Sequence, residues 1–313
     1  MLPRTRKEKI LRSKENLKYD FKYNGALITM LVAPLILLII FQYLPLYGIQ
    51  IAFKDYNPIE GVWNGKWVGL KYFKRFFNYY DFGKLLKNTV FLNSYDILLT
   101  PIPLIYALCI NYFPNKKIKN MIQTIAITPH FISTVVVCGL AMRFLSVVGA
   151  LNEFLTSLGK DSFNFLAHGE YFRSIYVWSG VWQNVGFSAI IYISALAEVS
   201  KDQHEAASID GANILQKIWY IDLPNVLPLF CVNLIFRCGS LLSNNYEKIL
   251  LFQNNVNMEY SQVISTYSYE IAFKGLVPQY SLSMAIGLVT SVVNVVMLLV
   301  VKKLTRRWEK IND

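Results

Sequence analysis

Charged residues are scarce in this sequence. Asp, Glu, Lys and Arg make up 16% of the 313 residues, and hydrophobic residues make up 54%. About a quarter of the residues of a soluble domain are charged. Several apolar runs are also close to the length of about 20 residues with which a helix crosses a bilayer. Both observations indicate a membrane protein with several spans and argue against a soluble globular domain.

Histidine and cysteine are also sparse. The three histidines, His130, His168 and His204, are far apart in the sequence and in predicted membrane side. The four cysteines all fall within apolar runs, at spacings that form neither a metal-binding pair nor a disulfide framework: Cys109, Cys138, Cys231 and Cys238. We therefore expect buried free thiols and no metal site.

The sequence lacks the short motifs of common enzymes. No H-E-x-x-H, G-x-S-x-G or C-x-x-C occurs. The string nearest to a nucleotide-binding P-loop, G-K-D-S at 159–162, lacks both the upstream glycine and the Ser or Thr after the lysine. The chain is therefore not expected to be an enzyme, to hold a cofactor, or to bind and split ATP by this route.

Basic residues give the chain a formal charge of +11, and most of them flank the apolar runs. This placement argues against nucleic acid as a partner. Residues 1–24, the short loop 115–120 and the tail 302–313 are rich in Lys and Arg, which membrane proteins retain in the cytoplasm. The pattern predicts spans near 27–47, 88–113, 121–147, 174–196, 226–246 and 282–301, with both termini cytoplasmic.

The predicted fold is all-α and integral to the membrane, with six transmembrane helices in one domain. This domain covers residues 25–301, between cytoplasmic tails at 1–24 and 302–313. Segments 50–83, 148–172 and 249–280 would lie outside, the first with a short helix near 70–79 and the second with one near 152–158. Frequent Lys, Asn and Ile suggest the plasma membrane of a bacterium.

The loop at 200–224 is polar, although it lies between two apolar spans. Ser200 and Gln203 form the S-x-x-Q pattern of a capping box, which predicts a helix from about Lys201. Asp210 and Gly211 predict a turn after it. A second short amphipathic helix follows at about 214–220, and Pro224 stops it or opens the next span. We expect two small helices at an angle on the cytoplasmic surface.

This loop resembles the EAA loop of permease subunits of ATP-binding-cassette (ABC) importers. The pattern is E-A-A, three residues, G, nine residues, and I-x-L-P. All seven fixed positions are filled, by Glu205, Ala206, Ala207, Gly211, Ile221, Leu223 and Pro224. The resemblance implies the type I ABC importer permease fold and a coupling role for these residues, with Asp210 in the turn between them. An ordinary amphipathic connector would not require this spacing.

A second stretch points to a subfamily. Residues 43–58, YLPLYGIQIAFKDYNP, and residues 67–73, WVGLKYF, resemble permeases of the polysaccharide and oligosaccharide import subfamily. The implied partners are a second homologous permease, two copies of a cytoplasmic ATPase that binds ATP and Mg, an extracellular solute-binding lipoprotein, and an oligosaccharide substrate. The implied mechanism is alternating access driven by closure of the ATPase dimer.

Six polar residues inside or beside the predicted spans are candidates for the substrate pathway. Asp96 and Arg237 lie at similar depth, so they could form an ion pair that lines the pathway or one that only joins two helices. The amides of Gln183, Asn184, Asn244 and Asn245 could bind sugar hydroxyls or join helices to one another.

Other functions remain open from the sequence. A permease of the same type could carry a different small solute. A membrane-embedded enzyme would need a catalytic constellation near a membrane face, and none is apparent. A passive channel would not need an ATPase docking loop.

Overall fold

The computed structural model describes residues 24–27 and 29–312, and the side chains up to residue 305. The predicted tail 1–24 lies outside the described residues except for Asn24. The chain divides into two compact units, Met1–Gly69 and Leu70–Asp313.

The first unit contains the first candidate span, Asn24–Phe53. Beyond it, strands β1 (Lys54–Asp55) and β2 (Lys66–Trp67) form a small antiparallel hairpin, with Lys54 opposite Trp67. The short helix α2 (Gly61–Asn64) lies in the turn between them.

The second unit is helical. Its helices are α3 (Lys71–Phe77), α4 (Phe82–Leu98), α5 (Pro101–Asn111), α6 (Lys116–Ile127), α7 (Thr134–Leu145), α8 (Ala150–Ser157), α9 (Phe172–Ala197), α10 (Lys201–Ile209), α11 (Ile214–Lys217), α12 (Leu223–Gly239), α13 (Tyr246–Phe252), α14 (Met258–Ser261), α15 (Ile264–Phe273) and α16 (Tyr280–Asn312). The predicted short helices near 70–79 and 152–158 are confirmed as α3 and α8.

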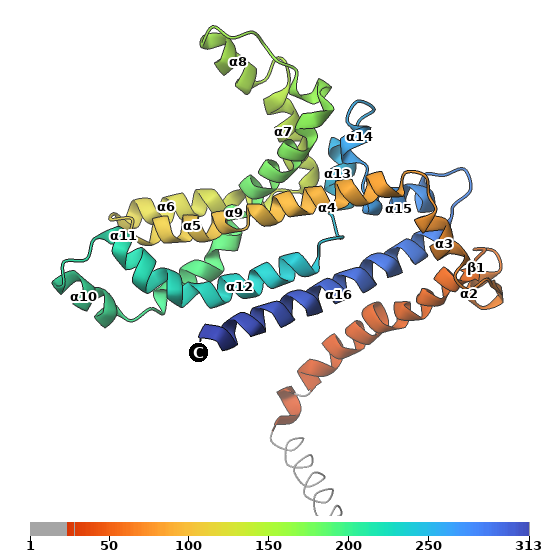
Figure 1. Ribbon diagram of the computed structural model, residues 1–313, viewed down its shortest axis with the longest axis horizontal. Helices are drawn as coiled ribbons and strands as arrows, with labels where there is room; N and C mark the ends of the chain where they lie inside the picture. Colours follow the sequence, from red (N-terminus) through yellow and green to blue (C-terminus); the bar gives the residue numbers. More distant parts are fainter. Residues whose placement is uncertain (1–23, 28, 313) are drawn as a thin grey trace, which may run out of the picture. The chain divides into compact units, whose positions relative to one another are not determined.

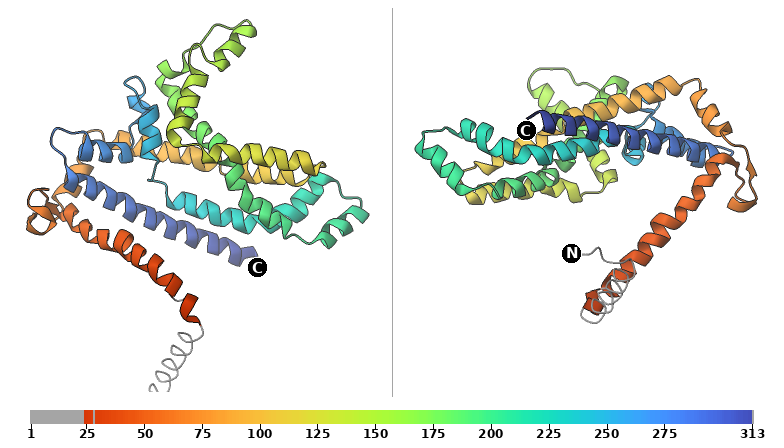
Figure 2. Two further views of the ribbon diagram at one scale, coloured as in Figure 1. Left: turned by 180° about the vertical axis from the view of Figure 1, so that it is seen from behind. Right: turned by 60° about the horizontal axis from the view of Figure 1, so that its bottom comes forward.

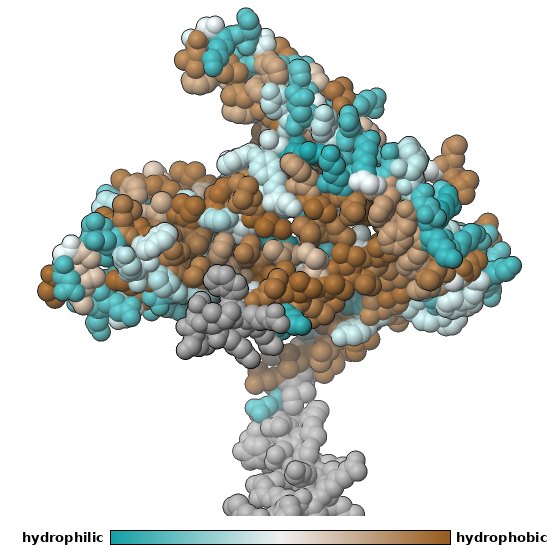
Figure 3. Space-filling view, in the orientation of Figure 1, coloured by the Kyte–Doolittle hydropathy of each residue, from teal (hydrophilic) through white to brown (hydrophobic). Residues whose placement is uncertain are grey.

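Among the residues that the structure describes, six helices are long and apolar enough to cross a membrane, which confirms the predicted fold class. They cover Asn24–Phe53, Phe82–Asn111, Thr134–Ser157, Gly169–Ala197, Ile214–Gly239 and Tyr280–Thr305. The face shown in Figure 3 is mostly apolar over the middle of the helix bundle, while polar residues gather at the end that carries α10 and α11. This distribution suits a bundle whose middle faces lipid.

Two predicted spans have wrong boundaries. The span expected at 121–147 is interrupted, because α6 ends at Ile127 and α7 begins at Thr134. Pro129 lacks an amide proton and the chain is extended at Ile132 and Ser133, where the Ser133 hydroxyl caps α7. The long apolar span therefore comprises α7 and α8.

The span expected at 226–246 begins at Ile214 and ends at Gly239. No break separates α11 from α12, because residues 218–222 form a π-helical turn directly before Leu223 and Pro224. The amide of Leu223 bonds to the carbonyl of Ile218, five residues back. This wider turn relieves the clash that a proline ring makes inside a regular helix. The first span uses the same arrangement at 39–43, ahead of Pro45.

Helix α9 lies at the centre of the second unit, with α5 and α6 packed along it and α12 crossing it (Figure 1). Near α10 and α11, the core forms around Leu104, Ala107, Ala189, Tyr192, Leu196 and Val226. Toward α13, a second core forms around Leu92, Cys138, Phe172, Val177, Ile249, Phe252 and Val263. Helix α16 packs on α12, α15 and α3, and its C-terminus lies toward the α10 end of the bundle (Figure 2).

Candidate functional site

The loop at 200–224 has the predicted form of a helix followed by a sharp turn. The Ser200 hydroxyl accepts a hydrogen bond from the amide of Asp202 and caps α10. Gly211 adopts a φ of +78°, which glycine tolerates without strain. The amides of Gly211 and Ala212 donate to the carbonyls of Ser208 and Ala207, and so complete a Schellman motif. The backbone itself therefore fixes the angle at which the chain leaves α10.

A second set of bonds fixes the far side of the turn. The side chains of Asn213 and Gln216 cap each other's amides at 2.9 and 2.8 Å, which starts α11. The Lys217 ammonium donates to the Ser208 hydroxyl at 2.7 Å and joins α11 to α10. We name residues 200–224 the coupling loop after the role that the sequence predicts for them, which stays a prediction here. The two helices of this loop form a braced corner.

The coupling loop exposes a mixed surface. Glu205 and Ala206 are exposed on α10, with Ala207 half-buried beside them. Ile209 is 86% exposed, and Leu215, Trp219 and Tyr220 are exposed as well. Exposed apolar side chains of this kind are typical of a surface that binds another protein or faces lipid, and Leu215, Trp219 and Tyr220 belong to the candidate span that begins at Ile214.

The other predicted coupling residues shape the loop. Asp210 is exposed at the end of α10, next to Gly211. Ile221 and Leu223 are half-buried where the π-helical turn meets α12, and Pro224 is exposed there. Leu223 packs against the core near α10, so this end of the loop is continuous with the bundle.

A buried carboxylate ties the coupling loop to the bundle. Asp222 is fully buried, and its Oδ2 accepts a hydrogen bond of 2.5 Å from the Tyr112 hydroxyl, just beyond the end of α5. Its Oδ1 lies 3.2 Å from Nε2 of His204 on α10. Burial raises the pKa of Tyr112 and the bond to Asp222 raises it further, so this hydroxyl stays a proton donor. We call these three residues the Asp222 cluster.

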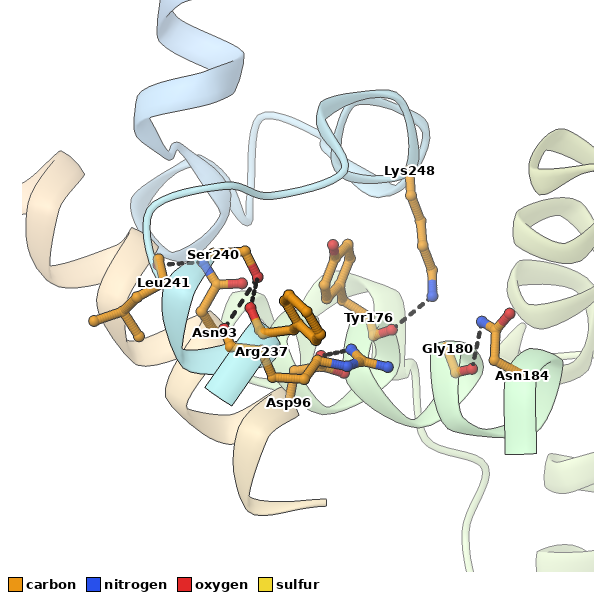
Figure 4. Close-up of polar contacts among 10 residues, drawn as sticks. Asn93, Asp96, Tyr176, Gly180, Asn184, Arg237, Ser240, Leu241 and Lys248 are labelled. Atoms are coloured by element: carbon orange, nitrogen blue, oxygen red, sulfur yellow. Dashed lines mark hydrogen bonds and ion pairs between the residues drawn. The ribbon is translucent and has the colours of Figure 1, made fainter. Parts of the chain in front are cut away.

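A polar cavity of about 520 Å³ opens among α4, α9, α12 and the segment leading to α13. Its walls include all six residues predicted for the substrate pathway: Asp96, Gln183, Asn184, Arg237, Asn244 and Asn245. Its volume is within the range of small-molecule sites. Figure 4 shows several of these side chains and the bonds among them.

Asp96 and Arg237 form the predicted ion pair across α4 and α12. The Arg237 guanidinium donates to Oδ2 of Asp96 at 2.6 Å. Their side chains remain 35% and 49% exposed, and both line the cavity. The pairing is confirmed, and a role in the substrate pathway stays a prediction.

We expect the double change Asp96→Ala with Arg237→Ala to destabilise the protein by less than the sum of the losses caused by the two single changes. Each single change leaves one charge without its partner in the bundle, at about 1–3 kcal/mol, between the values for exposed and buried pairs. Thermal unfolding of the four detergent-purified proteins measures the coupling. Strictly additive losses would show that the pair contributes no interaction energy.

The four amides differ in how much of their bonding is already satisfied. Gln183 donates to the carbonyl of Ile132 at 3.1 Å, and Asn184 contacts Nδ1 of His130 at 3.0 Å. Asn245 accepts from the amide of Lys248 and caps α13. Both side-chain polar atoms of Asn244 are buried and have no hydrogen-bond partner among the described residues. Asn244 is therefore the amide with the most bonding capacity left for a ligand.

Comparison with known proteins identifies the family. Residues 100–310 match the family described as binding-protein-dependent transport system inner membrane component. The chain is 34% identical to Protein LplB of Bacillus subtilis, over 99% of this chain and 98% of that one. It is 35% identical to the polygalacturonan/rhamnogalacturonan transport system permease protein YteP of the same organism, over 89% and 87% of the two chains.

The chain belongs to this family. It is a multi-pass membrane permease of the ABC importer class. A solved bacterial ABC transporter involved in the import of the acidic polysaccharide alginate has a chain that superposes on this permease with a TM-score of 0.83. That chain is 35% identical, and the match covers 93% of this chain and 99% of the other. The same kind of transporter has been solved with an alginate pentasaccharide-bound periplasmic protein, at a TM-score of 0.82.

Sequence reasoning misses two parts of this permease, the Asp222 cluster and Lys248. Asp222 occupies the variable position of I-x-L-P, and His204 directly precedes Glu205. A charge inside a span is a candidate for function, and this rule identifies Asp222 once the span begins at Ile214. The span predicted from the sequence begins only at Val226, which leaves Asp222 outside it.

Lys248 is the second part that sequence reasoning misses. It falls between the predicted span at 226–246 and the predicted outer loop at 249–280, but in the structure it is 5% exposed and lines the cavity. Its ammonium donates to the carbonyl of Tyr176 at 2.8 Å and lies over the ring of the same residue. Burial lowers the pKa of Lys248 to about 8. This value is still above 7, and the charged form of the side chain therefore predominates at pH 7.

Proposed function

We propose that this permease imports oligosaccharides delivered by an extracellular solute-binding protein, with ATP hydrolysed by a partner subunit. The observation that carries the proposal is the pairing of an EAA-type coupling loop with a polar cavity in one helical unit. The relatives named above support the substrate class, since their names mention polygalacturonan, rhamnogalacturonan and alginate.

The partners follow from the same proposal. Two permeases form a pseudo-twofold pair, this chain and a homologue, and each presents one coupling loop to one ATPase. ATP and Mg bind on the two ATPase copies, and this chain supplies neither a catalytic residue nor a cofactor site. The parts of segments 50–83, 148–172 and 249–280 that lie beyond the candidate spans provide the surface for a solute-binding lipoprotein. The alginate transporter is described in complex with a periplasmic protein.

The contacts of the Asp222 cluster suggest how motion reaches the cavity. A displacement of α10 moves His204, and through Asp222 it acts on α12 and on the chain after α5. Helix α12 carries Arg237, and α9, which packs against α5, carries Tyr176, Gln183 and Asn184. Movement of these walls as units would open the cavity to one side at a time.

The proposed topology places both termini and the coupling loop in the cytoplasm. We expect a cysteine at Asn64 or Asn255, in a cysteine-free background, to react with a membrane-impermeant maleimide in intact cells. Cysteines at Lys117 and Lys303 should react only after the membrane is permeabilised, because basic loops are retained inside. All four positions are exposed, so access to the reagent is governed by membrane side. Labelling at 303 in intact cells would rule out this topology.

Copurification tests the proposed function. The tagged permease, extracted from its native membrane in mild detergent, should bring down an ABC ATPase and a second six-span chain. An enzyme or a channel would need neither. Recovery of the folded permease alone, or with other copies of itself only, would contradict the proposal.

A further inference from the structure

The cavity contains a buried cation, Lys248, that no carboxylate of the described residues contacts directly; Asp96 acts on it only across a distance longer than that of an ion pair. Lys248 projects from α13 into the cavity wall, and its ammonium lies beside the carbonyl of Tyr176 (Figure 4). Among the described residues, no Asp or Glu oxygen lies within 4.0 Å of it. A lysine ammonium has three protons to donate, and the Tyr176 carbonyl takes one of them.

The other charges of the cavity cancel each other. Asp96 and Arg237 are paired at 2.6 Å, and Lys248 is the third charged residue in the lining. The cavity as a whole is therefore positive by one charge. Because a buried ammonium that no carboxylate contacts loses most of its hydration, an anionic ligand that contacts it would gain more here than at an exposed lysine.

The rest of the lining suits a saccharide. Neutral amides and hydroxyls line the walls, and Asn244 and Thr100 have buried polar atoms that lack a partner among the described residues. Such groups can bond to sugar hydroxyls without a charge. Tyr176 also lines the cavity and is half-buried, so its ring offers some aromatic surface to a sugar.

We propose that this cavity binds an acidic oligosaccharide, one that contains uronic acid, and that Lys248 recognises the uronate carboxylate. The proposal rests on the proposed function and specifies its substrate class. It also assigns a transmembrane substrate site to this subunit. Lys248 acts as the charged contact, and Asn244 acts as the neutral contact beside it.

Direct binding tests the proposal on the assembled transporter, without its solute-binding protein. The probes are trigalacturonate and its methyl ester, which differ in charge but have the same sugar rings. Equilibrium dialysis at pH 7 compares wild type with Lys248→Gln and Lys248→Arg. Wild type should bind the acid roughly tenfold to a hundredfold more tightly than the ester, the range for a hydrogen bond to a charged group.

The variants distinguish recognition from packing. Lys248→Gln should lose the preference for the acid while it still binds the ester, and Lys248→Arg should keep the preference. Equal binding of acid and ester by wild type would overturn the inference, whether or not the variants fold. An unchanged preference in Lys248→Gln would overturn it too. If neither probe binds to a complex that contains the ATPases, both this inference and the oligosaccharide assignment fail.

Discussion

Replacing Asp222 by alanine is expected to uncouple the ATPase from transport while the spans stay folded. Tyr112 loses the acceptor of its hydroxyl, which costs about 1–3 kcal/mol when a donor is left unpaired away from water, and His204 loses its 3.2 Å contact with the carboxylate. The orientation of α10 then depends on the backbone turn at Gly211 and on exposed bonds such as Lys217 to Ser208. We expect the variant to lose most of the stimulation of ATP hydrolysis by loaded binding protein.

Asp222→Asn is the matched control. Its amide oxygen can still accept from Tyr112, and its amide group can donate to a neutral His204. This variant should recover part of the stimulation. Basal ATP hydrolysis in the reconstituted complex should change little in either variant, since Asp222 does not bind nucleotide. If Asp222→Ala is stimulated as strongly as wild type, the Asp222 cluster does not transmit motion.

Gly186→Ala is expected to cause the largest loss of stability of any single methyl addition in α9. A Cβ at this position would overlap the carbonyl group of Ala126 and lie 2.6 Å from the amide nitrogen of Ile127. These are backbone atoms of α6, which cannot move aside as a side chain could. Small residues permit such close helix packing in membranes, and overpacking costs about 1–3 kcal/mol or more.

Gly287→Ala provides the comparison. It adds the same methyl group to α16, where no atom lies within 4 Å of the new Cβ. Alanine also favours a helix by roughly 0.5–1 kcal/mol over glycine. Thermal unfolding in detergent should therefore show a lowered Tm for Gly186→Ala and an unchanged or raised Tm for Gly287→Ala. Equal behaviour of the two variants would show that α6 and α9 are not in close contact.

Features that depend on local sequence could be predicted. The six spans follow from apolar runs, and the turn at Gly211 follows from the glycine that it requires. The pairing of Asp96 with Arg237 followed from the cost of a lone charge inside a membrane. Each of these predictions needs only the identity of the residue and its position within or between the apolar runs.

Features that depend on contacts between distant segments could not be predicted. The break at 128–133 and the π-helical turn at 218–222 both arise near prolines, but hydropathy alone does not show whether a proline bends a helix or ends it. Lys248 follows a predicted span by only two residues. Its burial is decided by α9, some seventy residues earlier in the chain.

The most direct test of the coupling loop is substrate-stimulated ATP hydrolysis by the reconstituted importer that contains Gly211→Val. Valine at a φ of +78° costs roughly 1–2 kcal/mol or more and should distort the corner between α10 and α11. Gly211→Asn is the control, because asparagine tolerates this conformation. We predict that Gly211→Val loses stimulation and ATPase binding, while Gly211→Asn keeps both. Full stimulation and full ATPase binding by Gly211→Val would contradict the assignment of residues 200–224 as the coupling loop.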